Sequence, residues 1–154
     1  MRVTVTGATG LVGGRLVREL TGRGDEVTVL SRNPDRARDA LGVEAVGWNP
    51  EHEPAPTAAL AGRDAVVHLA GENIAQRWSD DVKVELRRSR ELGTLNLVLG
   101  LEDADPRPAV LVSSSAVGYY GSRGDEELTE DAPPGQGFLS EVCLAWEREA
   151  NKAA

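Results

Sequence analysis

Short apolar runs alternate along the chain with longer stretches in which apolar residues recur every three or four positions. The short runs predict buried strands, and the longer stretches predict amphipathic helices. The predicted strands are 2–6, 26–30, 43–48, 65–69 and 109–112. The predicted helices are 11–21, 34–41, 80–101 and 139–150. Because strands and helices alternate, we expect an α/β fold with a doubly wound parallel sheet and helices on both faces.

Three glycines stand between the first predicted strand and the first predicted helix, within Thr6-Gly7-Ala8-Thr9-Gly10-Leu11-Val12-Gly13. Gly7 permits a tight turn, Gly10 lets the backbone approach a pyrophosphate, and Gly13 lets the helix pack close to the strand. A helix that begins here points unpaired N–H groups and its positive dipole end at a phosphate. The segment therefore predicts a Rossmann-like dinucleotide site, with a glycine-rich turn that binds nothing as the alternative.

The end of the second predicted strand indicates which dinucleotide binds. A protein that binds unphosphorylated NAD places Asp or Glu there to hold the ribose 2′-hydroxyl. This chain has Ser31-Arg32 instead. A guanidinium pairs with a 2′-phosphate through charge-assisted hydrogen bonds, and Ser31 adds a hydroxyl donor. We therefore expect NADP(H) rather than NAD, although Arg32 as a solvated surface charge remains the alternative.

Small and polar residues follow two later strands at the same expected edge of the sheet. Ala70 and Gly71 come after the strand 65–69, where small residues let a dinucleotide cross the sheet. Ser113 to Ser115 follow the strand 109–112 and are expected to face the ligand crevice. His68 has apolar neighbours and is expected to be a buried strand residue. Trp48 is expected in the core or at its rim, and a place beside an adenine ring is the less favoured alternative.

Composition removes several other classes of function. The chain has 154 residues, enough for one domain, and 17 Lys and Arg against 25 Asp and Glu give a formal net charge of −8. No basic face for a nucleic acid is visible, and no apolar run approaches the roughly 18 residues of a membrane helix. Met1-Arg2 leads directly into the first strand, and Cys143 is the only cysteine, so we expect a cytoplasmic protein without signal peptide or disulfide. The two histidines lie in unlike contexts, so no metal site is expected.

From Met1 to about Ala150 the chain resembles the extended short-chain dehydrogenases/reductases. The matching landmarks are the glycine turn 6–13, Asp64-Ala65-Val66-Val67-His68-Leu69-Ala70-Gly71, Gly93-Thr94, Ser113-Ser114-Ser115, Tyr120-Gly121, and Thr129-Glu130 ahead of Pro133. More narrowly, it is similar to the "epimerase family" branch of sugar-nucleotide epimerase-like proteins. The signatures of that branch are 69–75, Arg77-Trp78, Ser89-Arg90, 115–121 and Trp146-Glu147.

The resemblance implies an NADP(H)-binding domain that covers 1–154, with an unknown small molecule as substrate. It implies that Leu69 and Ala70 lie beside the second ribose and pyrophosphate, that Arg90 and less strongly Glu85 face the cofactor, and that Ser115 is catalytic. Together with the residues above, the expected cofactor-binding set is Gly7, Thr9, Gly10, Leu11, Val12, Gly13, Ser31, Arg32, Leu69, Ala70, Gly71, Glu85, Arg90 and Ser113. No nucleic-acid or membrane partner is expected, and a homodimer is left open.

Two departures from the family pattern limit what this chain is expected to do. Relatives carry a Tyr four residues before a Lys that lowers the pKa of its phenol, but the expected place here reads Phe138-Leu139-Ser140-Glu141-Val142-Cys143. Tyr119 or Tyr120 is a weaker substitute. Relatives are also about twice as long, so the last strands and the substrate lobe are expected to be absent. The expectation is thus the cofactor half of an NADP-dependent epimerase or reductase, with a binding or regulatory module that does not turn over substrate as the alternative.

Overall fold

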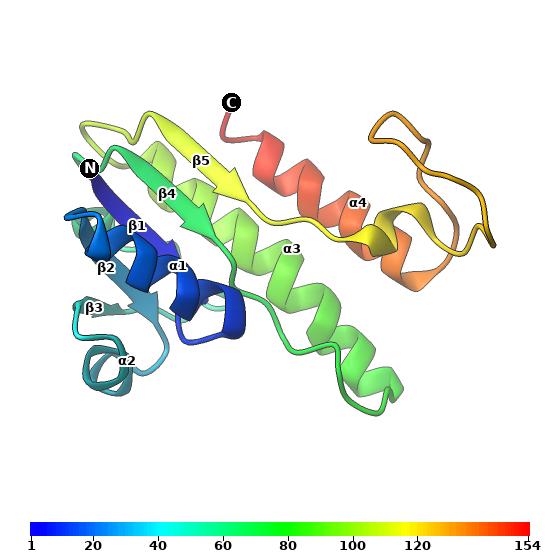
Figure 1. The fold of residues 1–154 in the computed structure, drawn as a ribbon, viewed down its shortest axis with the longest axis horizontal. Coiled ribbons are helices and arrows are strands. Elements are labelled where there is room, and N and C mark those ends of the chain that lie inside the picture. The colour runs from blue at the N-terminus through cyan, green and yellow to red at the C-terminus, as the bar shows by residue number, and fades with distance from the viewer.

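The computed structural model describes residues 1–154 and contains one five-stranded parallel sheet of order β3-β2-β1-β4-β5 (Figure 1). The strands are β1 (Arg2–Thr6), β2 (Glu26–Ser31), β3 (Glu44–Gly47), β4 (Ala65–His68) and β5 (Val110–Ser113). The chain builds outward from β1 in one direction and then restarts on its other side with β4. In the register of the sheet Thr6 pairs with Leu30 and with His68, so the carboxyl ends of β2, β1 and β4 meet at one edge. A dinucleotide binds at such a reversal of strand order.

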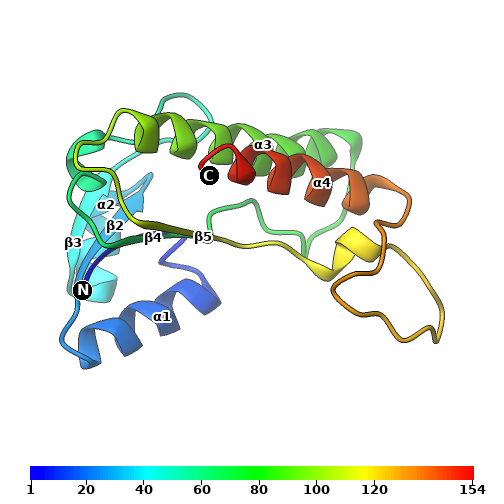
Figure 2. The ribbon, with the colours of Figure 1, turned by 90° about the horizontal axis from the view of Figure 1, so that it is seen from above.

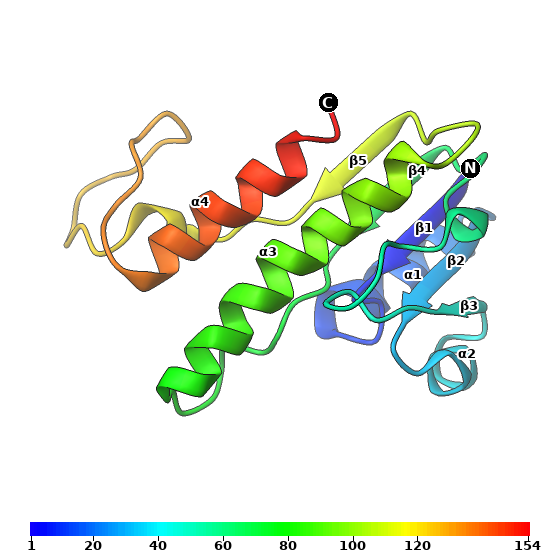
Figure 3. The ribbon, with the colours of Figure 1, turned by 180° about the vertical axis from the view of Figure 1, so that it is seen from behind.

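Helices cover both faces of this sheet, as the alternating pattern predicts. They are α1 (Leu11–Gly22), α2 (Pro34–Leu41), α3 (Asp80–Glu102) and α4 (Phe138–Asn151). Helix α1 lies on one face, and α3 and α4 run side by side on the opposite face (Figures 2 and 3). Local signals fix their ends: the Asn33 side chain accepts from the Arg36 N–H at the start of α2, and Ser79 caps α3 through the Val82 N–H.

The two faces of the sheet bury separate apolar clusters. The cluster under α1 and α2 contains Val3, Val5, Ala8, Val17, Leu20, Val27, Val29, Ala37 and Ala45. The cluster on the other face contains Leu30, Trp48, Ala55, Ala59, Leu60, Val66, Leu97, Leu101 and Ala104. β2 contributes Val27 and Val29 to the first cluster and Leu30 to the second, and β4 packs Val67 against the first and places Val66 in the second, so these two strands are buried on both sides.

The β5 strand, at one edge of the sheet, is covered on one face only. Leu111 packs against the cluster beneath α3, whereas Val110 and Val112 point the other way and are 49% and 52% exposed. A hollow beside this strand is lined by Ser113 to Ser115 and by the last residues of the chain, which end next to β5 (Figure 1). The strand thus has a free edge and an uncovered apolar face.

Two short 3₁₀ helices were not apparent in the apolar pattern. These are η1 (Thr57–Ala59), which leads into the turn before β4, and η2 (Val117–Tyr120), which follows β5. The segment between η2 and α4 has no regular structure and extends away from the rest of the molecule (Figure 1). Its base is held by Ser140, whose hydroxyl contacts the carbonyls of Tyr119 and Gly135. No helix is both long enough and apolar enough to span a membrane.

Candidate functional site

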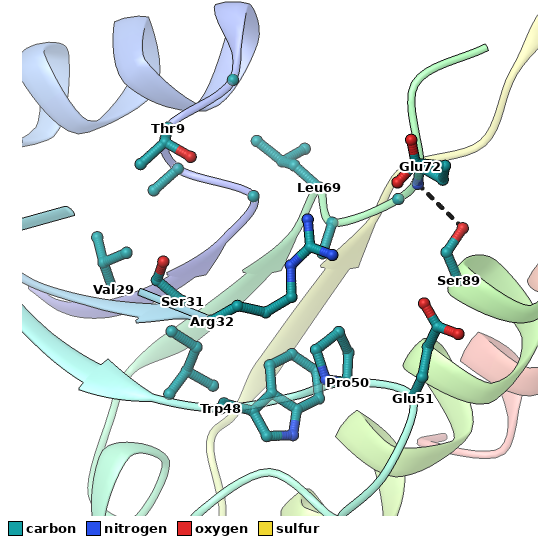
Figure 4. A pocket seen from close by; sticks show the side chains of 16 residues that line it. Thr9, Val29, Ser31, Arg32, Trp48, Pro50, Glu51, Leu69, Glu72 and Ser89 are labelled. Atoms are coloured by element: carbon teal, nitrogen blue, oxygen red, sulfur yellow. Dashed lines mark hydrogen bonds between the residues drawn. The ribbon is translucent and has the colours of Figure 1, made fainter. Parts of the chain in front are cut away.

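A cavity of about 280 Å³ opens at the carboxyl ends of β1, β2 and β4 (Figure 4). Its lining brings together five parts of the chain: the turn after β1, the end of β2, the loop after β3, the turn after β4 and Ser89 of α3. The lining residues are Gly7, Ala8, Thr9, Gly10, Val29, Leu30, Ser31, Arg32, Trp48, Pro50, Glu51, Leu69, Ala70, Gly71, Glu72 and Ser89. Eight of the residues expected from the sequence therefore share one cavity: Gly7, Thr9, Gly10, Ser31, Arg32, Leu69, Ala70 and Gly71.

The glycine turn has no room for side chains. Gly7 has a φ of +66°, and a Cβ there would lie 2.5 Å from the carbonyl of Leu69. A Cβ on Gly13 would overlap the Gly7 carbonyl, so this glycine allows α1 to pack against the turn. Gly10 begins α1 in an extended conformation and offers no side-chain cap, so the first amides of the helix keep their N–H groups free for a ligand.

Leu11 and Val12 contribute to this turn through their backbone. Their side chains are 94% and 66% exposed and do not line the cavity. Their N–H groups belong to the first turn of α1, where no carbonyl of the helix can accept from them. An anion at this end of α1 would meet these amides and the positive end of the helix dipole.

Arg32 supplies the cationic group at the end of β2. Its side chain projects into the space between the glycine turn and the Trp48–Pro50 segment (Figure 4). It takes part in no ion pair, so its guanidinium is available to a ligand. The neighbouring Ser31 hydroxyl lies 3.2 Å from both the N–H and the carbonyl of Asn33, which shapes the turn into α2. Neither the last residue of β2, Ser31, nor the next residue, Arg32, carries a carboxylate.

A buried hydrogen-bond network fixes the turn after β4. The Thr6 hydroxyl accepts from the N–H groups of Leu69 and Ala70, both at 3.2 Å, and lies 2.7 Å from Nδ1 of His68. Because the two amides occupy its lone pairs, this hydroxyl donates its proton to Nδ1. Nε2 of His68 therefore carries the ring proton and donates it to the Thr94 hydroxyl on α3, at 3.0 Å. Burial lowers the pKa of His68 to about 4, so the ring is neutral at pH 7.

The wall formed by the loop after β3 contains Trp48, which the sequence analysis expected in the core or at its rim, and two residues that it did not assign, Pro50 and Glu51. Trp48 is 3% exposed and lines the cavity, so it is both a core residue and part of the site. Pro50 and Glu51 follow it in a proline-containing loop that carries no recognisable motif. Contacts with α3 decide their position, and no local pattern could have indicated them.

Besides Leu11, Val12 and Gly13, four expected site residues do not line the cavity. Ser113 and Ser115 line the hollow beside β5, and the Ser115 hydroxyl donates to the carboxylate of Glu147 on α4. Arg90 lies behind Gly71, where it donates to the Glu72 carbonyl at 3.1 Å. Glu85 is an exposed residue of α3. Their expected roles stay predictions.

Arg90 and Cys143 share a poorly solvated region between α3 and α4. The Arg90 guanidinium lies 5.3 Å from the ring centre of Trp146, and burial lowers the pKa of this guanidinium. Burial and the nearby Glu147 carboxylate raise the pKa of the Cys143 thiol, which keeps the thiol protonated. The Cys143 thiol is thus neutral, and the Arg90 guanidinium on α3 is a cation near it.

A parallel sheet with a glycine turn at its strand-order reversal defines an NAD(P)-binding Rossmann-like domain of the short-chain dehydrogenase/reductase type. The family model for the NAD dependent epimerase/dehydratase family matches residues 3–138, and the chain belongs to that family.

Similar proteins place it among the epimerase family proteins. An Arabidopsis thaliana protein, "Epimerase family protein SDR39U1 homolog, chloroplastic", is 39% identical over 99% of this chain and 45% of its own length. A crystal structure of human epimerase family protein SDR39U1 with NADPH has a TM-score of 0.80 and 34% identity, over 97% of this chain and 48% of that one. The structure of a nucleoside-diphosphate sugar epimerase from Corynebacterium glutamicum has a TM-score of 0.80 and 38% identity, over 99% of this chain and 31% of that one. The chain spans less than half of the length of each.

Proposed function

We propose that this chain binds NADP(H) in the cavity at the carboxyl ends of β1, β2 and β4. One observation carries the proposal: Arg32 and the glycine turn line the same cavity, and no carboxylate closes β2. A carboxylate at that position would repel a 2′-phosphate, whereas an unpaired guanidinium attracts it. The similar human protein, whose structure was determined with NADPH, supports this choice over NAD.

Each part of the cavity then has a role. The amides of Leu11 and Val12 hold the pyrophosphate at the start of α1, while the Gly10 N–H donates to the Gly7 carbonyl within the turn. Arg32 pairs with the 2′-phosphate, and the turn at Leu69 and Ala70 borders the central part of the dinucleotide. Gly10 fits a phosphate group there, because the residue before α1 carries no side chain that would cover the first amides of the helix, while Gly7 lets the turn approach the backbone of Leu69. The bound nucleotide supplies hydride transfer, and the protein supplies binding and orientation.

The test is a calorimetric titration of the chain with NADPH and with NADH. We expect NADPH to bind at least tenfold more tightly, because a charge-assisted hydrogen bond contributes about 1.5–3 kcal/mol. Arg32→Ala should remove most of that preference. Arg18→Ala is the matched control, since Arg18 is exposed on α1 and does not line the cavity. Equal affinities of the unmodified chain for the two nucleotides would refute the assignment.

Two functions of the bound nucleotide are compatible with this site. In the first, the chain is the cofactor half of an epimerase or reductase acting on a small molecule, and Ser115 hydrogen-bonds to the reacting oxygen. In the second, the chain binds or senses NADP(H) without turnover. The second is favoured by the start of α4, where residues 138–143 contain neither Tyr nor Lys, and by the Ser115 hydroxyl, which donates to the Glu147 carboxylate.

A further inference from the structure

Three buried polar side chains connect α3 with the turn after β4, and the binding mode described above gives no role to the first of them. Thr94 on α3, His68 on β4 and Thr6 on β1 are each 0% exposed. The Thr94 hydroxyl lies 3.0 Å from Nε2 of His68, and the Thr6 hydroxyl lies 2.7 Å from Nδ1 of the same ring. Thr94 does not line the cavity. Any effect of Thr94 on a nucleotide there has to pass through His68.

The other end of this network is the turn that borders the cavity. The Thr6 hydroxyl accepts from the N–H groups of Leu69 and Ala70, and both of these residues line the cavity. Their backbone also lies against the glycine turn: a Cβ at Gly7 would lie 2.5 Å from the Leu69 carbonyl and 2.7 Å from the Ala70 nitrogen. A shift of these two amides therefore changes the spacing between two walls of the cavity.

Only one arrangement of protons lets the network hold both amides. The Thr6 hydroxyl uses its two lone pairs for the amides, so its single proton goes to Nδ1 of His68. Burial keeps the imidazole neutral, so it carries one proton, which is then on Nε2. This buried N–H needs an acceptor, and the Thr94 hydroxyl is that acceptor. Thr94 thus decides which ring nitrogen carries the proton.

Loss of the Thr94 hydroxyl would reverse this order. The Nε2–H of His68 would be buried without a partner, which favours the tautomer that carries its proton on Nδ1. Thr6 would then have to accept that proton, and it has no lone pair for it while both amides are bound. One amide of the turn would be released, and the turn would no longer have a single geometry before a ligand binds.

We propose that Thr94 is a positioning residue for the nucleotide site: it holds His68 in the Nε2–H tautomer and thereby keeps Thr6 as the acceptor for both amides of the turn after β4. The proposal rests on the proposed function, because the effect of Thr94 is read as nucleotide affinity. Thr94 makes no contact with the ligand. Its contribution is preorganisation, since a turn that is ordered beforehand costs less to order on binding.

The first experiment determines the tautomer of His68 directly. The histidine rings are labelled with ¹⁵N, and NMR spectra near neutral pH show which ring nitrogen carries the proton, with the exposed His52 as internal reference. We expect the Nε2–H form in the unmodified chain and in Thr94→Ser, and the Nδ1–H form in Thr94→Val, which keeps the shape of threonine without its hydroxyl. An Nδ1–H form in the unmodified chain overturns the proposal whether or not any variant folds.

The second experiment measures binding by calorimetry for NADPH and for adenosine 2′,5′-bisphosphate. Thr94→Val should weaken NADPH binding by about tenfold, the effect of about one hydrogen bond, and Thr94→Ser should restore it to within about twofold. The bisphosphate lacks the second phosphate and the nicotinamide riboside, so it does not extend along the turn after β4. Its affinity should change by about twofold or less in Thr94→Val, which localises the effect to that turn.

Thr4→Val is the matched control. Thr4 is also 0% exposed on β1, and its hydroxyl donates to the Ala59 carbonyl at 2.5 Å, away from the cavity. In urea denaturation Thr4→Val should lose stability as Thr94→Val does, but its affinity for NADPH should equal that of the unmodified chain. In a His68→Asn background Thr94→Val should have no further effect on NADPH binding, because the link to Thr6 is then cut.

Unchanged NADPH affinity in Thr94→Val overturns the proposal, as does an equal loss of affinity for NADPH and for the bisphosphate, which would indicate a general loosening of the domain. If the unmodified chain does not bind NADPH, the proposed function fails. If it binds NADPH over NADH and Thr94→Val binds NADPH equally well, only the assignment of Thr94 fails.

Discussion

His68 should make the stability of this domain fall between pH 6.5 and 4. The ring is 0% exposed, and burial lowers its pKa from 6.5 to about 4. Above pH 6.5 the ring is neutral in the folded and unfolded chains, so His68 contributes no pH dependence there. Below pH 6.5 the unfolded chain binds a proton that the folded chain does not, and stability is lost until the folded pKa is reached.

The size of this effect follows from the pKa difference. A shift from 6.5 to about 4 is worth about 3 kcal/mol at 1.36 kcal/mol per unit. The geometry explains why protonation is resisted: Nδ1 accepts the Thr6 hydroxyl proton, and Nε2 already donates to Thr94. A proton on Nδ1 would face the proton of that hydroxyl, whose two lone pairs are occupied by the amides of Leu69 and Ala70.

Urea denaturation at several pH values between 7.5 and 4 measures the effect. His68→Asn keeps an acceptor for Thr6 and cannot titrate, so its loss of stability on acidification should be smaller by about 3 kcal/mol. His52→Asn is the control, because His52 is exposed in the loop after β3 and its removal should leave the profile unchanged. Parallel profiles for the unmodified chain and His68→Asn would show that the burial argument is wrong.

Two further outcomes are expected. Gly7→Ala should lower the free energy of unfolding by more than about 2 kcal/mol and abolish NADPH binding, because the φ of Gly7 is +66° and a Cβ would lie 2.5 Å from Leu69. Gly22→Ala is the control: a Cβ there has no atom within 4 Å, so this variant should be neutral or stabilised by up to about 1 kcal/mol. With simple aldehydes and ketones the chain should consume no NADPH above background in an absorbance assay, because the Ser115 hydroxyl is held by Glu147 and no Tyr and Lys pair is present; consumption that disappears in Ser115→Ala would contradict this.

The glycine turn could be predicted from the sequence because its conformation depends on residues within the turn. Gly7, Gly10 and Gly13 have conformations or contacts that a side chain would disturb, and the strand and helix on either side show their own periodicity. The observed bounds of the strands differ from the predicted ones by at most one residue; in β3 the apolar pattern continues into Trp48 although the strand ends at Gly47. The parallel sheet is confirmed, and the chain spans about half the length of the relatives it matches.

The Trp48–Glu51 wall could not be predicted because its position depends on residues far along the chain. Asn96 fixes Pro50 across 46 positions, and Gly93 and Gly100 let the loop lie against α3. Asn96 and Gly100 belong to no motif, and the Gly93-Thr94 landmark does not indicate a contact with this loop, so the role of all three appears only when α3 crosses the sheet. The pairing of Ser115 with Glu147 has the same origin, since it spans 32 positions and two elements.

The two ends of the proposed ligand would contact parts of the sheet that differ in burial: one is covered on both faces, the other on one face only. The cavity lies over β1, β2 and β4, which are buried on both faces, so its walls are fixed by a finished core. Ser113 and Ser115 instead follow β5, where Val110 and Val112 leave one face uncovered. The proposed recognition of the adenosine and phosphate groups therefore depends on strands that are buried on both faces. A reaction at Ser115 would depend on β5, which has a free edge and one uncovered face. Because of this difference in burial, the structure supports nucleotide binding more strongly than catalysis.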